Sequence, residues 1–168
     1  LSLERLSDVI DHPQEAPEDN NTRIIMPPIK GDIVFQNIQF RYKPSSPLLL
    51  PGLSLTIPHG KFVAVVGTSG SGKSTLTKLV ARLYTPEAGT VLVDGIDIAK
   101  VELYSLRRQI GIVPQETVLF SGTIYDNLVM AHPHASFEDV IAACKSAEIH
   151  STIEKLPNGY QTEIGERG

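Results

Sequence analysis

The amino-acid sequence predicts an α/β fold that opens with antiparallel strands. Apolar residues alternate in 33–40 and 53–57, which is typical of half-buried strands. An unbroken apolar run at 62–66 then predicts a strand covered on both faces, and apolar residues at helical spacing follow it in 73–84. The 168 residues suffice for one domain with a sizeable core.

The composition of the chain argues against nucleic-acid binding as its function. Charged residues make up 20% of the chain, the formal net charge is -4, and Lys and Arg are scattered along the sequence. No nucleic acid is therefore expected as a partner, because binding its phosphates requires a basic surface. The single cysteine, Cys144, lies in an apolar helical run and is expected in the core rather than as a reactive thiol.

The start of the chain differs in composition from the rest. Residues 1–10 place leucine, valine and isoleucine at helical spacing, and Pro13 ends that pattern. The stretch 12–28 combines prolines with acidic residues, as linkers do. We therefore expect 1–30 to be the connection from a preceding transmembrane domain plus a linker, and 31–168 to be the first part of the domain itself.

The further elements of 31–168 follow in order. The first alternating strand ends near Tyr42, and Pro86 stops the helix at 73–84. Additional strands are expected at 91–94 and 110–113, and additional helices at 103–108, 123–130 and 136–147. The expected architecture is an antiparallel β-rich subdomain, a central sheet, and the start of a helical subdomain.

A glycine-rich loop joins the strand at 62–66 to the helix at 73–84. It fits the P-loop pattern, in which four variable residues separate a glycine from Gly-Lys-Ser or Gly-Lys-Thr. Its residues are Gly67, Thr68, Ser69, Gly70, Ser71, Gly72, Lys73 and Ser74, and we add Thr75 to the site. A chance Gly/Ser-rich turn is the alternative, but a strand before and a helix after favour a phosphate-binding loop.

These residue types suit phosphate chemistry. Glycines let the backbone curl so that its N–H groups point at phosphate oxygens, and the helix start adds partial positive charge. Lys73 is expected to reach the β- and γ-phosphates, and the Ser74 hydroxyl is expected to ligate Mg²⁺. The loop alone admits a small-molecule kinase, a GTPase, a helicase or a transporter motor.

The rest of the chain resembles the ATP-binding cassette (ABC) family over residues 31–168. The segment 109–115, Gln-Ile-Gly-Ile-Val-Pro-Gln, resembles the one that ends in the family's Q-loop glutamine. The segment 119–124 with Asn127 resembles exporters rather than importers. The segment 162–168 resembles the short exporter loop that precedes the signature motif and touches the membrane domain.

Two further site residues follow from this resemblance. Tyr42 matches the aromatic residue that stacks on adenine, and an aromatic suits that role because any base has a π-face. Gln115 matches the glutamine whose amide contacts Mg²⁺ and the attacking water. The resemblance thus implies ATP and Mg²⁺ as ligands, with Lys73 and Gln115 in catalysis and with Ser74 and Gln115 at the metal.

Two other patterns are set aside. Asp94 closes an apolar strand, as a magnesium-binding aspartate of P-loop proteins does, but Asp94-Gly95 is a turn signal. We therefore predict a structural role for it. His132 and His134 flank a proline in an expected loop, and no neighbouring cysteine or carboxylate pair completes a metal site in the sequence.

The resemblance implies a P-loop NTPase-type sheet and an ATPase that drives transport. The signature motif, the Walker B aspartate with its catalytic glutamate, and the switch histidine are expected after Gly168. The fold is therefore expected to be incomplete at the C-terminus, and 1–168 to bind ATP–Mg without turnover. The implied partners are a transmembrane domain of the same polypeptide and a second nucleotide-binding domain, at the cytoplasmic face of the inner membrane.

The resemblance is greatest to bacterial exporters of peptides or proteins, of the type I secretion or bacteriocin type. Another P-loop enzyme, such as a kinase, is the alternative. It requires a second substrate pocket and a lid that carries arginine, and the sequence displays neither.

Overall fold

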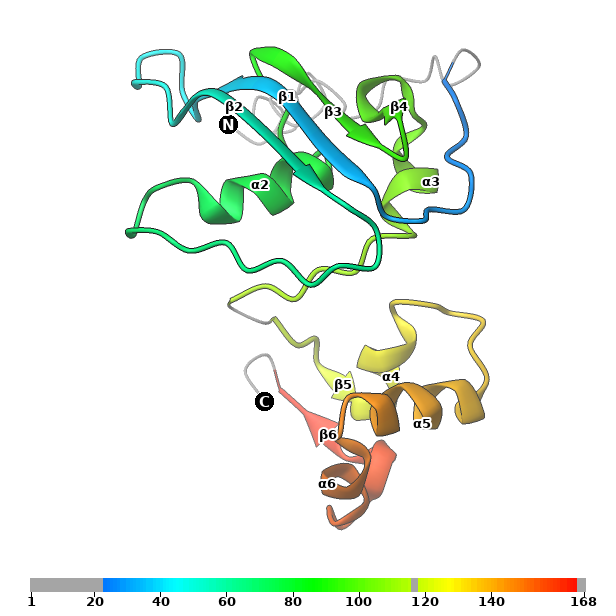
Figure 1. Cartoon of the computed structure of the whole chain (residues 1–168). Helices are drawn as coiled ribbons and strands as arrows, with labels where there is room; N and C mark the ends of the chain where they lie inside the picture. Colours follow the sequence, from blue (N-terminus) through cyan, green and yellow to red (C-terminus); the bar gives the residue numbers. More distant parts are fainter. Residues whose placement is uncertain (1–22, 116–117, 166–168) are drawn as a thin grey trace, which may run out of the picture. The chain divides into compact units, whose positions relative to one another are not determined.

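The computed structural model describes residues 23–115 and 118–165. The chain forms two compact units, Leu1–Ile112 and Val113–Gly168 (Figure 1). The predicted helix in 1–10 lies outside the described residues, as does most of the predicted linker. The boundary proposed at residue 30 therefore stays a prediction.

The first unit is built on a four-stranded antiparallel sheet. Its strand order is β2-β1-β3-β4 (Figure 1). The strands are β1 (Ile33–Phe40), β2 (Leu50–Ile57), β3 (Ala88–Val93) and β4 (Ile96–Asp97). The central strand β1 pairs Ile33 with Ile57 on one side and with Val93 on the other. The α/β class with an antiparallel start is confirmed.

The helix α2 (Lys73–Val80) lies along one face of this sheet (Figure 1). Its Leu79 is fully buried with Phe35, Ile38 and Phe40 of β1 in one apolar core. The helix is shorter than predicted because the chain turns before Pro86. Arg82 adopts a left-handed conformation with φ 51°, and the Leu83 N–H donates to the Lys78 carbonyl at 2.8 Å. This pattern closes the last turn of a helix.

The segment that follows β4 holds the start of the first unit in place through hydrogen bonds. It contains the 3₁₀ helix η2 (Ile98–Lys100) and the helix α3 (Leu103–Arg107). The Ser105 hydroxyl accepts from the Met26 N–H at 2.9 Å, and the Gln109 side chain accepts from the Ile29 N–H at 2.9 Å. The extended segment before β1 is thereby held against α3.

Two predicted strands are wrong. Neither 62–66 nor 110–113 forms a strand, and Phe62 and Val113 are 98% and 93% exposed. A strand exists only where a neighbour supplies its hydrogen bonds and covers its faces. Among the described residues no strand pairs with either segment, so the apolar pattern that predicts a buried strand finds no partner there.

The second unit combines a two-stranded ribbon with three short helices. The strands β5 (Gly122–Thr123) and β6 (Glu163–Ile164) pair antiparallel. The other elements are α4 (Ile124–Val129), α5 (Phe137–Ser146), α6 (His150–Glu154) and the 3₁₀ helix η3 (Gly159–Gln161). The sequence predicts α4 and α5, whereas α6, η3 and the ribbon are found only in the structure.

Capping and a small core stabilise this unit. The side chains of Thr123 and Ser136 each accept from the backbone of the aspartate three residues later, which closes capping boxes at α4 and α5. Cys144 is 2% exposed and packs with Val140, Ile153 and Tyr160. Its predicted place in the core is confirmed. Nowhere in 23–115 or 118–165 is there a helix with the length and apolar character needed to cross a membrane.

Candidate functional site

The glycine-rich loop adopts the curl that its sequence predicts. Gly70 and Gly72 have φ angles of 79° and 91°, a region that residues with a side chain rarely adopt. At Gly72 an added Cβ would also approach Leu50 Cδ2 to 3.1 Å. Glycine is therefore required at the point where the loop becomes α2.

The start of α2 collects positive charge inside this curl. Gly72 caps the helix without a side-chain hydrogen bond, and the first turn carries no acidic residue. The Lys73 ammonium donates to the carbonyls of Gly67 and Thr68 at 2.9 and 2.7 Å. Backbone N–H groups at a helix start and an adjacent ammonium together attract an anion.

The next two residues of α2 present hydroxyl groups in different settings. Ser74 is exposed on the first turn, whereas Thr75 is 3% exposed. The Thr75 hydroxyl lies 2.9 Å from the Tyr42 hydroxyl, and either oxygen can be the donor. The structure thus brings Tyr42, which is 33 residues away in sequence, to the helix of the phosphate loop.

Tyr42 belongs to a small aromatic cluster. Its ring centroid lies 4.9 Å from that of Phe40 and 5.1 Å from that of Tyr84, in edge-on arrangements. The Lys78 ammonium lies 5.5 Å from the Tyr42 ring centroid. Tyr42 remains 45% exposed, so the packed cluster leaves part of its side chain accessible.

Gln115 belongs to the second unit. It is exposed and follows the segment 110–113, which forms no strand. Its catalytic and metal-binding roles stay predictions. In the same unit the Asn127 side chain bonds both the N–H and the carbonyl of Phe120, at 2.8 and 2.9 Å. The exporter-like segment 119–124 is therefore held in place by Asn127.

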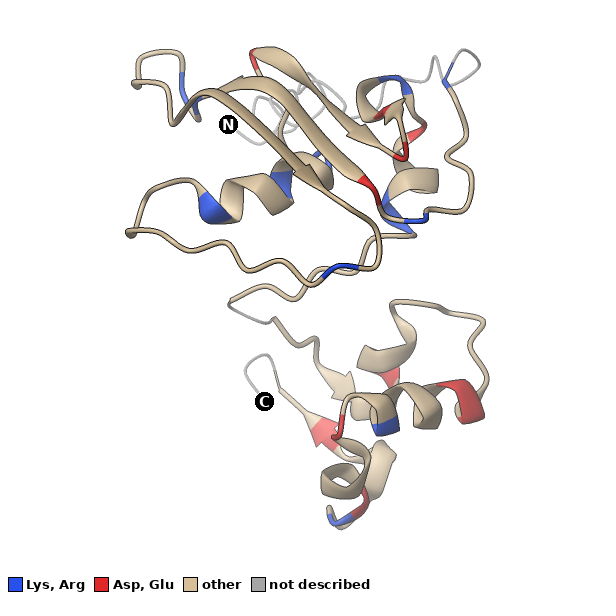
Figure 2. Cartoon of the chain, viewed as in Figure 1, with Lys and Arg blue, Asp and Glu red and all other residues tan. Residues whose placement is uncertain are grey.

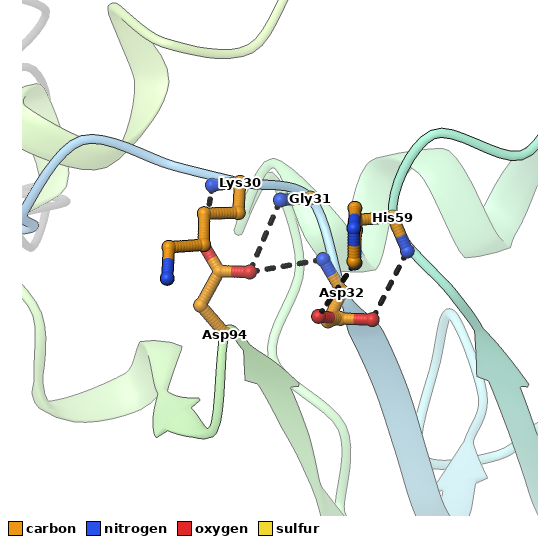
Figure 3. Close-up of polar contacts among 5 residues, drawn as sticks. All are labelled: Lys30, Gly31, Asp32, His59 and Asp94. Atoms are coloured by element: carbon orange, nitrogen blue, oxygen red, sulfur yellow. Dashed lines mark hydrogen bonds and ion pairs between the residues drawn. The ribbon is translucent and has the colours of Figure 1, made fainter.

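Asp94 has a structural role, as predicted. With φ angles of 50° and 78°, Asp94 and Gly95 form the tight turn between β3 and β4. Figure 3 shows the Asp94 carboxylate accepting from the backbone N–H groups of Lys30, Gly31 and Asp32, at 2.6, 3.0 and 2.9 Å. Partial burial works to raise the pKa of Asp94, but these three donors lower it below its ordinary value.

The other carboxylates of 23–112 also have structural partners. Asp32 accepts from the His59 backbone and contacts its ring (Figure 3). Glu87 pairs with Arg41 at 2.9 Å. Asp97 and Glu102 cap η2 and α3, and hydrogen bonds from Tyr104 and Ser105 lower the pKa of Glu102. Each of these carboxylates is thus committed to holding the backbone or an arginine or histidine in place.

The basic side chains and the potential metal-binding side chains are further polar features of the described chain. In Figure 2 the Lys and Arg positions are spread over several elements, and α2 carries a basic residue in its first and last turns, Lys73 and Lys78. Within the described ranges, no group of three or more His, Cys, Asp or Glu side chains is arranged to hold a metal ion.

Comparison with known proteins decides the family. Residues 50–165 match the family model described as ABC transporter. The chain belongs to the ABC transporter family. This assignment favours the predicted ABC architecture over the alternative of a P-loop kinase.

Over its whole length, this chain is nearly half identical to relatives within the ABC family. The alpha-hemolysin translocation ATP-binding protein HlyB of Escherichia coli is 48% identical over 168 residues. The leukotoxin export ATP-binding protein LtxB of Aggregatibacter actinomycetemcomitans is 46% identical over the same length. All of this chain is covered in both comparisons, and it spans 23% of each relative.

A solved structure gives the same assignment. A bacterial Atm1-family ABC exporter with ATP bound matches 98% of this chain with a TM-score of 0.89 and 41% sequence identity. The match covers 28% of that exporter chain. The chain thus spans about a quarter of the length of its ABC relatives.

Sequence reasoning missed how the aromatic cluster meets the P-loop helix. The motif includes Thr75 only as the residue after Ser74, and the sequence says nothing of a contact with Tyr42. Tyr84 and Lys78 carry no motif signal either. Their meeting depends on α2 packing beneath β1, a tertiary contact that local patterns do not encode.

Proposed function

We propose that this chain is the ATP-binding part of an ABC exporter that couples ATP binding and hydrolysis to transport across a membrane. The observation that carries the proposal is the curl of Gly67–Ser74 at the start of α2, with the Lys73 ammonium held inside it. Phosphates bound there would receive backbone N–H groups, the helix dipole and the lysine charge together.

A magnesium ion fits the donors that this site offers. The exposed Ser74 hydroxyl is a hard oxygen ligand of the kind that Mg²⁺ accepts beside nucleotide phosphates. We assign Ser74 and Gln115 as its protein ligands, and Gln115 as the residue that orients water. The ion would neutralise charge on the β- and γ-phosphates during transfer to water.

The adenine ring is assigned to Tyr42. The tyrosine is partly exposed, it lies next to the P-loop helix, and its ring is fixed by Phe40 and Tyr84. A fixed aromatic ring offers a stacking surface without losing much side-chain freedom on binding. Phosphate loop and aromatic cluster together match the two ends of a nucleotide.

We infer the setting and the substrate class from the relatives. Their names describe translocation or export of alpha-hemolysin, a leukotoxin and RTX toxin I. We therefore propose a protein or peptide as the exported substrate, in the manner of type I secretion. The partners would be a transmembrane domain of the same polypeptide and a second nucleotide-binding domain, at the cytoplasmic face of the inner membrane.

Residues 1–168 are proposed to hold ATP–Mg without hydrolysing it. Hydrolysis needs a group that orients water in line with the γ-phosphate. Every carboxylate in 23–112 already caps a helix, closes a turn or pairs with a basic side chain. Because the chain spans 23% of the HlyB relative, we assign the catalytic glutamate and the signature motif to a part of the exporter that 1–168 does not cover.

Phosphate release by 1–168, and by a longer chain that includes the sequence after Gly168, tests this function. We expect no release above background from 1–168. The longer chain should release phosphate in a manner that depends on Lys73 and on protein concentration, because two domains close over each ATP. The Lys73→Ala form of each chain is the control. Lys73-dependent release by 1–168 alone would contradict the proposal and require a catalytic carboxylate within these residues.

A further inference from the structure

Tyr42 is held on several sides by neighbours. Phe40 and Tyr84 contact it edge-on, with ring centroids 4.9 and 5.1 Å away. The Lys78 ammonium approaches both tyrosine rings, at 5.5 Å from the centroid of Tyr42 and 5.7 Å from that of Tyr84. These contacts restrict the plane of the Tyr42 ring.

The hydroxyl end is fixed by the P-loop helix. Thr75 is 3% exposed, and among residues 23–112 it shares its place as a buried polar residue with Ser105. Its Oγ1 lies 2.9 Å from the Tyr42 Oη. A buried hydroxyl without a partner costs free energy, so this contact is favoured in the folded state. Thr75 follows Ser74 directly, so one turn of α2 reaches both the phosphate loop and the aromatic ring.

We infer that Thr75 is a positioning residue that sets the angle of Tyr42 for a nucleoside base. This inference rests on the proposed ATP-binding function. The Thr75 hydroxyl, one residue after Ser74, holds the Tyr42 hydroxyl at 2.9 Å and so ties the aromatic ring to the helix of the phosphate loop. The site therefore favours ligands that carry both a base and phosphates, and Thr75 links recognition of the two ends.

The contact with Thr75 and stacking alone predict different effects of Tyr42→Phe on ATP affinity. Stacking needs only an aromatic face, so stacking alone predicts that Tyr42→Phe binds ATP as well as the parent does. The bond to Thr75 predicts that the phenol oxygen matters. Removing it should weaken ATP about 3- to 10-fold, the range that corresponds to one net hydrogen bond.

The experiment compares ATP with inorganic tripolyphosphate, which lacks the base. Dissociation constants for both, with Mg²⁺, are measured by calorimetry on the full-length protein and on its Thr75→Val, Tyr42→Phe and double variants. We expect each single variant to lose about 3- to 10-fold in ATP affinity and little in tripolyphosphate affinity. The double variant should lose no more than either single one, because both changes remove the same bond.

Two further variants provide controls. Thr75→Ser keeps the hydroxyl and should bind ATP nearly as the parent does. Thr77→Val removes a hydroxyl that bonds only the Ser74 carbonyl within the helix, at 2.9 Å, and should change neither affinity.

Different results would contradict the positioning role of Thr75 and the proposed ATP-binding function. Unchanged ATP affinity in Thr75→Val, or equal losses for ATP and tripolyphosphate, would overturn the positioning role while leaving the ATP site intact. Additive losses in the double variant would also overturn it. If the parent itself binds ATP no better than its Lys73→Ala form, the proposed function fails instead.

Discussion

Lys73 is the first residue of α2, and Tyr42 contacts the same helix from a distant part of the sequence. Lys73 begins α2 and bonds the carbonyls of Gly67 and Thr68, and Tyr42 reaches the second residue after it, Thr75. Charge is thereby placed at one end of the site and an apolar ring at the other. A nucleotide needs both, because its phosphates are recognised by charge and its base by stacking.

Replacement of Tyr42 by alanine tests the apolar end. Stacking of a base on an aromatic side chain contributes on the order of 1–3 kcal/mol, so Tyr42→Ala should weaken ATP by about 5- to 150-fold. Equilibrium titration with a fluorescent ATP analogue measures the change. Tyr104→Ala is a matched control, since that tyrosine is 72% exposed on α3 and belongs to no proposed ligand site. ATP binding by Tyr42→Ala at parental strength would return Tyr42 to a purely structural role.

At the scale of elements, the turn between β3 and β4 anchors the start of β1. The Asp94 carboxylate accepts three backbone hydrogen bonds from 30–32, a segment that precedes β1. The Asp94 side chain thus joins the turn between β3 and β4 to the segment that leads into β1. This explains why an aspartate at a strand end serves the fold here rather than a metal.

Asp94→Asn should lower the free energy of unfolding by about 1–2 kcal/mol at pH 7, because an amide offers one acceptor oxygen in place of two charged ones. The lowered pKa of Asp94 gives the pH dependence. Its contribution is complete above the unfolded-state value of about 3.9 and is lost as the pH falls through the lower folded-state pKa.

Thermal unfolding between pH 7 and pH 3 measures this difference. The matched control is Glu87→Gln, which removes an exposed ion pair with Arg41 and should change stability by less than about 1 kcal/mol. A loss for Asp94→Asn that persists unchanged into acid would show that the charge of Asp94 is not the cause.

The sequence predicts well those elements whose cause is local. Alternation identifies β1 and β2, and serine, threonine and aspartate in capping boxes mark α4 and α5. The P-loop is recognisable because its glycines and Lys73 are required by backbone geometry and charge. In contrast, 62–66 is apolar enough for a buried strand but has no described neighbour to pair with. The Tyr42–Thr75 contact escapes prediction because it depends on how α2 packs beneath the sheet.

At the scale of the whole molecule, membership of the ABC family and the geometry of the phosphate loop point to the same chemistry. The chain matches an ATP-bound exporter with a TM-score of 0.89 and covers 28% of it. The segments 62–66 and 110–113 expose apolar residues that a larger sheet would cover. We therefore expect residues 1–168 to bind ATP, and we expect hydrolysis to need further residues of the exporter.

Titration of ATP–Mg into the full-length protein and its Lys73→Ala form tests the central claim most directly. Loss of the charge-assisted bonds from Lys73 to phosphate should cost roughly 1.5–3 kcal/mol, which weakens ATP about 10- to 150-fold. Thr77→Val serves as the control on the same helix and should bind as the parent does. Equal ATP affinities of the parent and Lys73→Ala would contradict the account, because the phosphate loop would then have no part in binding.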